Sequence, residues 1–145
     1  MDDGTPLIMI VDDEPDMCWA LEHILRKRGH PSKKASSGRE AMKLLELYKF
    51  RMAFVDMKLP DMEGLELARR MKSLDPTTLI VMISGLCYKD DPAVQEALKE
   101  QLIFDFIAKP FLHADIDASI ENANSRALLA LRAKESTPQN KESDP

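Results

Sequence analysis

The chain has 145 residues, of which 44% are hydrophobic, and this length and apolar content suit one ordinary globular domain with short tails. A formal net charge of −5 and the absence of a basic stripe with interleaved aromatics argue against binding of nucleic acid by this chain, and no apolar run approaches the length of a membrane span. The acidic N-terminus is unlike a signal peptide, and Cys18 and Cys87 stand in no metal-ligand spacing, so we expect a cytoplasmic protein with reduced thiols.

Short apolar runs alternate along the chain with segments of helical periodicity, as in the βαβ units that build a parallel sheet. The expected strands are residues 7–11, 32–35, 52–55, 79–83 and 103–108. The expected helices begin near Pro15, Ser37, Gly64, Asp91 and His113. The second strand is polar and follows Pro31, so we place it at an edge of the sheet. The pattern therefore predicts an α/β fold with five strands and five helices.

Local signals mark several helix ends. Gly29 should stop the first helix, and Ser37 with Glu40 has the pattern of a capping box at the start of the second. The fourth helix should begin at Asp91 and run to about Gln101.

The last helix is longer than a small domain needs. Its apolar stripe continues past residue 124, whereas residues 135–145 lack aliphatic side chains. We therefore predict an N-terminal extension (1–6), a single domain (7–124), an extension of the last helix (125–134) and a disordered tail (135–145).

Polar residues follow four of the expected strands at the ends where ligands bind in open parallel sheets. They are Asp12, Asp13, Asp56, Ser84 and Lys109. Clustered carboxylates resist ionisation unless a hard cation such as Mg²⁺ joins them. Taken singly, each residue could be a helix cap or ordinary loop chemistry. Together they indicate a phosphoryl-transfer site.

Four motifs carry a family resemblance, and the match as a whole spans about residues 7–123. They are Ile10-Val11-Asp12-Asp13-Glu14-Pro15, Val55-Asp56-Met57-Lys58-Leu59-Pro60-Asp61-Met62-Glu63-Gly64, Ser84-Gly85 and Lys109-Pro110-Phe111. In order and spacing they resemble the receiver domains of two-component response regulators. Residues 17–22 are further similar to receivers of the nitrogen-regulation type. The resemblance implies a doubly wound, flavodoxin-like sheet in the order 2-1-3-4-5.

The resemblance also implies roles for these residues. Asp56 would accept a phosphoryl group from a phosphohistidine on a sensor histidine kinase or phosphotransfer protein. Mg²⁺ would be held by Asp13, Asp56 and the backbone carbonyl of Lys58, with Asp12 binding directly or through water. Lys109, the Ser84 hydroxyl and the amides of Lys58 and Gly85 would bind the phosphoryl group, and Pro110 would follow a cis peptide bond.

A switch is implied as well. Ser84 would move toward the phosphoryl group and Phe106 would turn inward, unless it simply remains a core residue. The change would alter the surface of the fourth helix, fifth strand and last helix, where a downstream target, an effector domain or a second copy could bind. The segment from Leu86 to Phe104 is longer than usual in the family, so this chain's partner cannot be inherited from relatives.

Two other classes stay open. A phosphatase of the haloacid-dehalogenase type also uses an aspartyl nucleophile with Mg²⁺, but it needs an acid where this chain has Lys58. A non-phosphorylated pseudo-receiver would not need the complete set of polar residues. We therefore expect a phosphoacceptor that assists its own phosphorylation and dephosphorylation rather than an enzyme with a separate substrate. Leu86 should shield the acyl phosphate from water, with a smaller effect from Lys58.

Overall fold

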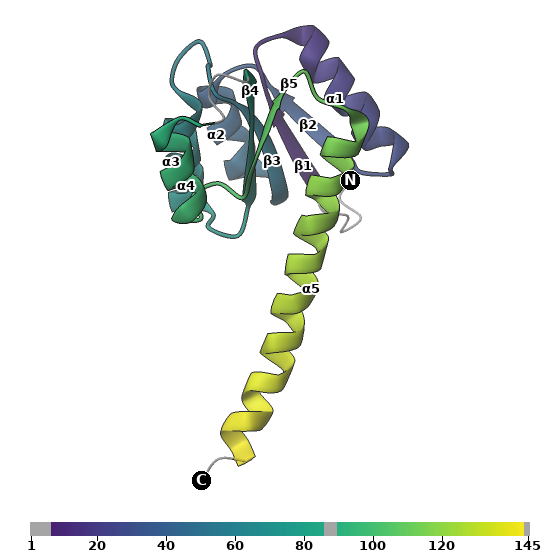
Figure 1. Ribbon diagram of the computed structural model, residues 1–145, viewed down its shortest axis with the longest axis vertical. Coiled ribbons are helices and arrows are strands. Elements are labelled where there is room, and N and C mark those ends of the chain that lie inside the picture. Colours follow the sequence, from purple (N-terminus) through teal and green to yellow (C-terminus); the bar gives the residue numbers. More distant parts are fainter. Residues whose placement is uncertain (1–6, 86–89, 144–145) are drawn as a thin grey trace. The chain divides into compact units, whose positions relative to one another are not determined.

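The computed structural model describes residues 7–85 and 90–143, which form two compact units, one ending at Phe111 and one beginning at Leu112. The first unit is built on a five-stranded parallel sheet in the order β2-β1-β3-β4-β5 (Figure 1). The strands are β1 (Leu7–Val11), β2 (Ser32–Ala35), β3 (Phe50–Asp56), β4 (Leu79–Gly85) and β5 (Asp105–Lys109). The predicted fold class and strand order are confirmed, and β2 lies at the edge as expected.

Four helices of the first unit connect these strands and cover both faces of the sheet. They are α1 (Pro15–Lys27), α2 (Gly38–Leu47), α3 (Gly64–Leu74) and α4 (Pro92–Lys99). Figure 1 shows α1 on one side of the sheet and α2, α3 and α4 on the other. Each crossover returns the chain to the start of the next strand, so all strands end at the same edge.

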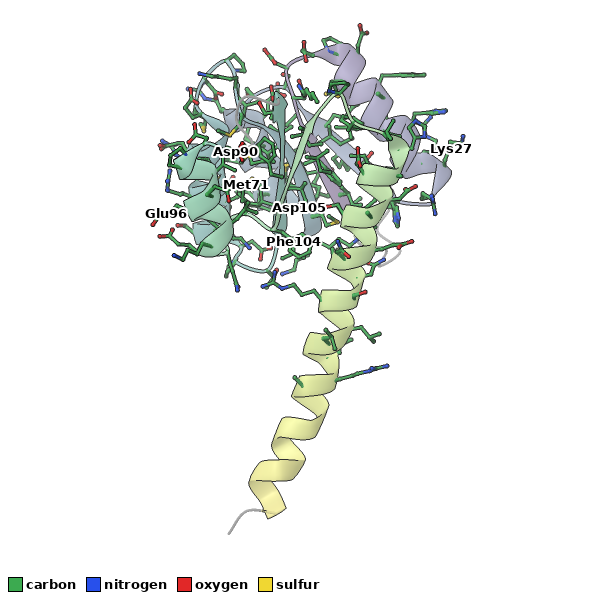
Figure 2. The ribbon with its side chains drawn as sticks, viewed as in Figure 1. Lys27, Met71, Asp90, Glu96, Phe104 and Asp105 are labelled. Atoms are coloured by element: carbon green, nitrogen blue, oxygen red, sulfur yellow. The ribbon has the colours of Figure 1, made fainter. Side chains whose placement is uncertain are left out.

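Strand residues alternate between the two faces, and both faces are apolar because helices cover both. One cluster of buried side chains lies between the sheet and helices α2, α3 and α4. Its strand members include Met9, Val11, Ala53, Val55, Ile80 and Met82. Its helical members include Ala41, Leu45, Leu67, Met71, Val94 and Ala97. Figure 2 shows Met71 on the inner side of its helix and the exposed Glu96 on the outer side of α4.

The predicted cap of α2 is confirmed in part. The Ser37 hydroxyl accepts a hydrogen bond from the Glu40 amide at 3.1 Å. The Glu40 carboxylate accepts from the amide of Ser36 at 2.8 Å, not from that of Ser37 as in a standard capping box. The reciprocal bond is therefore shifted by one residue.

Helices α1 and α4 end in the same hydrogen-bonded turn, the Schellman motif. In α1 the left-handed position is Gly29, with a φ of 78°, so glycine ends this helix as predicted. In α4 it is Gln101, with a φ of 64°, which ends the helix at Lys99 rather than near residue 101. The amides of Leu102 and Phe104 then bond to Ala97 and Ile80, and β5 starts at Asp105 instead of residue 103.

The second unit is helix α5 (His113–Ser143). Its first turns bury Ile116, Ser119, Ile120 and Ala123 at a spacing of three and four residues. The helix continues past residue 134, where the sequence suggests the start of a disordered tail. Within the described part of the chain, no helix is long and apolar enough to cross a membrane.

Candidate functional site

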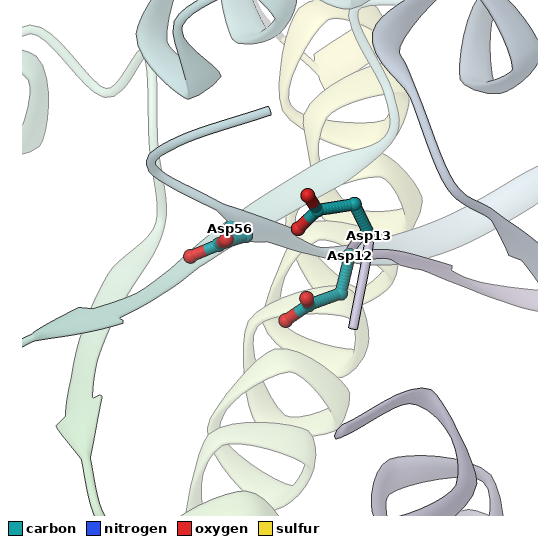
Figure 3. Close-up of side chains that lie close together, drawn as sticks. All are labelled: Asp12, Asp13 and Asp56. Carbon is teal, nitrogen blue, oxygen red and sulfur yellow. The ribbon is translucent and has the colours of Figure 1, made fainter. Parts of the chain in front are cut away.

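Three carboxylates meet at the carboxyl edge of the sheet. Asp12 follows β1, Asp56 ends β3, and the two strands pair in parallel up to Val11 and Val55, so the two acids leave the sheet side by side. Asp12, Asp13 and Asp56 each offer an oxygen, and these oxygens lie within 4.8 Å of one another (Figure 3). The convergence expected from the sequence is therefore present.

Burial sets the electrostatics of this cluster. The exposed fraction is 3% for Asp12 and 8% for Asp56, whereas Asp13 is exposed. Burial and the nearby Asp12 carboxylate raise the pKa of Asp56 to about 6, against an opposing effect of Lys109. Burial also raises the pKa of Asp12, although the Glu14 amide, 2.9 Å from its Oδ1, favours the ionised form. Both acids therefore carry unfavourable desolvation in the metal-free protein.

Lys109 provides a cation to the cluster. Its Nζ lies 3.4 Å from Asp12 Oδ2, 3.5 Å from Asp56 Oδ1 and 3.4 Å from Glu14 Oε1. Burial works to lower its pKa, but the attraction of Asp12 and Asp56 outweighs burial and raises that pKa. One ammonium thus faces three carboxylates, and the peptide bond between Lys109 and Pro110 is cis, as the family resemblance implies.

The oxygen donors suit a hard divalent cation. Three carboxylates that are mutually close and partly desolvated are the ligand type that Mg²⁺ prefers. A single ammonium balances only part of their charge, so the cluster has capacity for a cation. Asp12, Asp13 and Asp56 could therefore hold a metal ion.

The hydroxyl predicted for the site lies on the neighbouring strand. Ser84 and Gly85 are the last two residues of β4, opposite Ala108 and Lys109 of β5. Ser84 is buried. Because β4 and β5 pair in parallel and end together, Ser84 lies at the sheet edge that also carries Lys109.

The loop after Asp56 is held close to the strand. The backbones of Lys58 and Glu63 form an isolated antiparallel β-bridge. Their side chains also pair, with Lys58 Nζ 3.5 Å from Glu63 Oε2. The Gly64 amide donates to the Met57 carbonyl at 2.6 Å. A Cβ on Gly64 would collide with the Asp56 carbonyl oxygen and lie 2.9 Å from the Met57 Cα, so this position requires glycine.

Phe106 lies on β5 opposite Met82, partly buried against the cluster that packs under α2, α3 and α4. That position fits both roles expected for it, a switch residue and a plain core residue. Leu86 and Cys87 lie outside the described residues. Cys18 is buried and free, and its thiol donates to the Asp12 carbonyl at 3.2 Å.

Sequence reasoning missed three supporting residues. Glu14 stands beside the acidic pair, but only the structure shows that it reaches Lys109. Gly64 and Asp61 belong to the quoted motif, yet the close backbone approach at Gly64 and the contacts of Asp61 with α2 depend on tertiary structure. All three residues lie within the quoted motifs, and those motifs were the signal in the sequence that could have identified them.

Comparisons with known proteins agree with this geometry. The family described as "Response regulator receiver domain" matches residues 8–121. The chain is 31% identical over 110 residues to sporulation initiation phosphotransferase F of Bacillus subtilis, covering 76% of this chain and 84% of that protein. It is 28% identical over 128 residues to the C4-dicarboxylate transport transcriptional regulatory protein DctD of Rhizobium meliloti, covering 88% of this chain but 27% of that regulator. The match to DctD is consistent with the similarity of residues 17–22 to receivers of the nitrogen-regulation type.

A solved structure shares the architecture. The receiver domain protein (CheY-like) of Methanospirillum hungatei JF-1 superposes with a TM-score of 0.77 at 26% identity, covering 86% of this chain and 98% of that one. The family match spans most of the first unit and the start of the second. The chain therefore belongs to the family of response regulator receiver domains.

Proposed function

We propose that this chain is a phosphorylation-dependent switch of a two-component system, with Asp56 as the phosphoacceptor. The observation that carries the proposal is the placement of one buried carboxylate, Asp56, within reach of two further carboxylates and 3.5 Å from the Lys109 ammonium. A nucleophile flanked by metal ligands and a cation is the arrangement that phosphoryl transfer needs.

In the proposed reaction, a carboxylate oxygen of Asp56 forms a bond to phosphorus as the phosphorus–nitrogen bond of a phosphohistidine breaks. The electron pair of the broken bond stays on the imidazole nitrogen of the donor. Lys109 pairs with the phosphoryl oxygens as a compact cation. The Ser84 hydroxyl and the amides of Lys58 and Gly85 donate hydrogen bonds to the remaining phosphoryl oxygens.

Asp12, Asp13, Asp56 and the Lys58 carbonyl are the proposed ligands of Mg²⁺. When bound, Mg²⁺ would offset the negative charge shared by the carboxylate and phosphoryl oxygens. The support is the chemistry of the donors, which are oxygens that a hard cation prefers.

The proposed output is a change at the surface of α4, β5 and α5. Phosphorylation adds about 1.5 to 2 negative charges and three acceptor oxygens. Ser84, buried at the end of β4, would shift toward them, and Phe106 on the neighbouring strand would repack. The phosphoryl site would be coupled to the output surface through the adjacent strands β4 and β5, so no long pathway is needed.

The proposed partners are a sensor histidine kinase or phosphotransfer protein as donor, and a downstream protein or effector domain as target. The chain spans about a quarter of the length of the regulator DctD, which is described as a transcriptional regulatory protein. Any DNA contact of a longer protein would come from residues outside this chain, whose own charge is −5. A homodimer through the output surface and a cytoplasmic location are further predictions.

The rival phosphatase fits less well. Its second acid would occupy the position of Lys58, whose exposed ammonium pairs with Glu63. A pseudo-receiver would not require a buried, desolvated Asp56 beside Lys109. We therefore propose self-assisted phosphorylation and dephosphorylation without a separate substrate.

The test is treatment with acetyl phosphate and Mg²⁺ followed by intact-protein mass spectrometry. We expect a gain of one phosphoryl group that chelation of Mg²⁺ prevents and that Asp56→Asn abolishes. Lys58→Ala removes the exposed ammonium but keeps the backbone carbonyl and amide that are proposed to act in the site, so it should still be labelled. Label that persists in Asp56→Asn, or none in the parent protein, would reject the proposal.

A further inference from the structure

The loop after Asp56 is tied to a different helix by one carboxylate. Asp61 lies in the segment between β3 and α3, and its two oxygens accept the amides of Gly38 and Arg39, each at 2.9 Å. These amides open α2 and have no partner within the helix. The tie joins residues more than twenty positions apart, so it fixes one loop against another rather than stabilising a local turn.

The α2 helix does not need Asp61 for an ordinary cap. Ser37 already supplies the cap residue, because its hydroxyl accepts the Glu40 amide. Asp61 instead satisfies the two amides that Ser37 leaves open. Its charge also suits the positive end of the helix dipole. The helix start is thus shared between a local residue and a residue of the β3–α3 loop.

A packing contact reinforces this tie. Any Cβ on Gly38 would come within 2.6 Å of the Met62 sulfur, so the side chain following Asp61 sits directly on the first residue of α2. Within the loop, the Leu59 amide donates to the Met62 carbonyl at 3.2 Å. The segment from Lys58 to Met62 is therefore a short closed turn, and α2 anchors its outer end.

That turn carries backbone atoms of the site. Lys58, two residues after Asp56, supplies the carbonyl proposed to bind Mg²⁺ and the amide proposed to bind the phosphoryl group. Neither atom can be adjusted by a side-chain rotamer, so its position depends on what holds the loop. The Lys58–Glu63 bridge holds the inner end and Asp61 holds the outer end.

We propose that Asp61 is a positioning residue for the phosphoacceptor site, which fixes the Lys58 backbone by anchoring the β3–α3 loop to the start of α2. This inference rests on the proposed function and adds to it a residue that touches neither metal nor phosphoryl group. Loss of Asp61 weakens Mg²⁺ binding and slows phosphorylation of Asp56, although all carboxylate ligands remain.

The experiment compares Asp61→Ala and Asp61→Asn with Ser37→Ala. Ser37→Ala is the matched control because it also removes a cap of α2 but leaves the loop tied. The readouts are the Mg²⁺ dissociation constant, the rate of labelling by acetyl phosphate, and hydrogen exchange of residues 57–63 in metal-free protein. The exchange measurement requires no metal and no phosphorylation.

We expect Asp61→Ala to raise the Mg²⁺ dissociation constant by about tenfold, the lower end of effects seen for residues that support metal ligands. Asp61→Asn retains one acceptor oxygen and should have a smaller effect in the same direction. Exchange of residues 57–63 should accelerate in both, and Ser37→Ala should match the parent in Mg²⁺ affinity.

The outcomes separate the two proposals. If Asp61→Ala and Ser37→Ala change Mg²⁺ affinity and loop exchange equally, Asp61 is only a helix cap and the inference is wrong. If Asp61→Ala does not fold, Asp61→Asn decides by the same comparison. If the parent binds no Mg²⁺ and accepts no phosphoryl group, the proposed function fails, whereas the exchange measurement still tests the anchor.

Discussion

The Nζ of Lys109 lies 3.5 Å from Oδ1 of Asp56, so the cation at the end of β5 already faces the proposed phosphoacceptor before any phosphoryl group is added. The Lys109 ammonium also pairs with the carboxylates of Asp12 and Glu14. Phosphorylation would therefore redistribute an existing ion-pair network, which links the chemistry on β3 to β5, a strand of the proposed output surface.

Lys109→Ala should uncouple phosphorylation from output. Without the ammonium, Asp56 can still be labelled, but the phosphoryl group no longer engages β5. Hydrogen exchange of residues 93–107 should then be the same with and without a phosphoryl mimic, whereas in the parent it should differ. An unchanged exchange pattern in the parent on adding the mimic would contradict the switch.

The same variant should raise the pKa of Asp56 above about 6 in metal-free protein, because Lys109 opposes the effects of burial and of Asp12. Carboxyl-carbon NMR during a pH titration measures this directly. Lys58→Ala is the control, since its ammonium pairs with Glu63. A fall in the Asp56 pKa in Lys109→Ala would show that Lys109 does not act on Asp56 as described.

Asp56→Asn should stabilise the metal-free protein at neutral pH. The pKa of Asp56 is raised from 3.8 to about 6 by folding, so the folded state holds its proton more tightly. Stability from this group is present below pH 3.8 and is lost as pH rises through 6, because ionisation is then easier in the unfolded chain. The cost removed by the substitution is about 2 to 3 kcal/mol at pH 7.

Urea unfolding of parent and Asp56→Asn between pH 5 and pH 8, with a chelator present, tests this prediction. The difference in unfolding free energy should grow with pH and level off above neutrality. Asp75→Asn offers a control of opposite sign: burial raises the pKa of Asp75, but hydrogen bonds from Thr77 and the charge of Lys49 outweigh it and lower that pKa. Because Asp75 is then ionised in both the folded and the unfolded chain between pH 5 and pH 8, its replacement should destabilise the protein by an amount that does not change over this range. A pH-independent difference for Asp56→Asn would argue against a desolvated carboxylate.

Gly64→Ala should damage the site through the backbone. The added Cβ meets the Asp56 carbonyl and the Met57 Cα, neither of which can rotate away. We expect a loss of about 1–3 kcal/mol in unfolding free energy and weaker Mg²⁺ binding. Gly38→Ala is also at the first position of its helix, but the three atoms nearest to its added Cβ all belong to the flexible Met62 side chain, so it should cost less. Equal costs would show that the Asp56 backbone yields freely.

Substitutions at the two Schellman turns should change the stability of the protein in opposite directions. Gly29→Ala puts a Cβ at a φ of 78° with no atom within 4 Å, so it should lose about 1 kcal/mol through conformation alone. Gln101→Gly relieves the same conformation at a φ of 64° and should raise the melting temperature. Thermal unfolding measures both, and a fall in melting temperature for Gln101→Gly would mean that its side chain contributes more than the backbone strain costs.

The sequence by itself determined the fold class, the strand order through family resemblance, and the residues that end four of the five strands at the site. It could do so because apolar periodicity follows local backbone geometry and because strands in a parallel sheet all end at one edge. Gly29 and Ser37 were predictable for the same reason, since a helix end is decided within a few residues.

Only the tertiary structure decided what lies across the site. The contact of Glu14 with Lys109 and the hydrogen bond of Asp61 to the start of α2 each join residues that are distant in sequence. The close approach of Gly64 to the Asp56 backbone depends on distances that differ by fractions of an ångström. The end of α4 at Lys99 likewise depended on Gln101 adopting a left-handed conformation that glutamine rarely takes. Desolvation of Asp56 arises from the packing of several elements around one edge, so its raised pKa belongs to the fold and not to the motif.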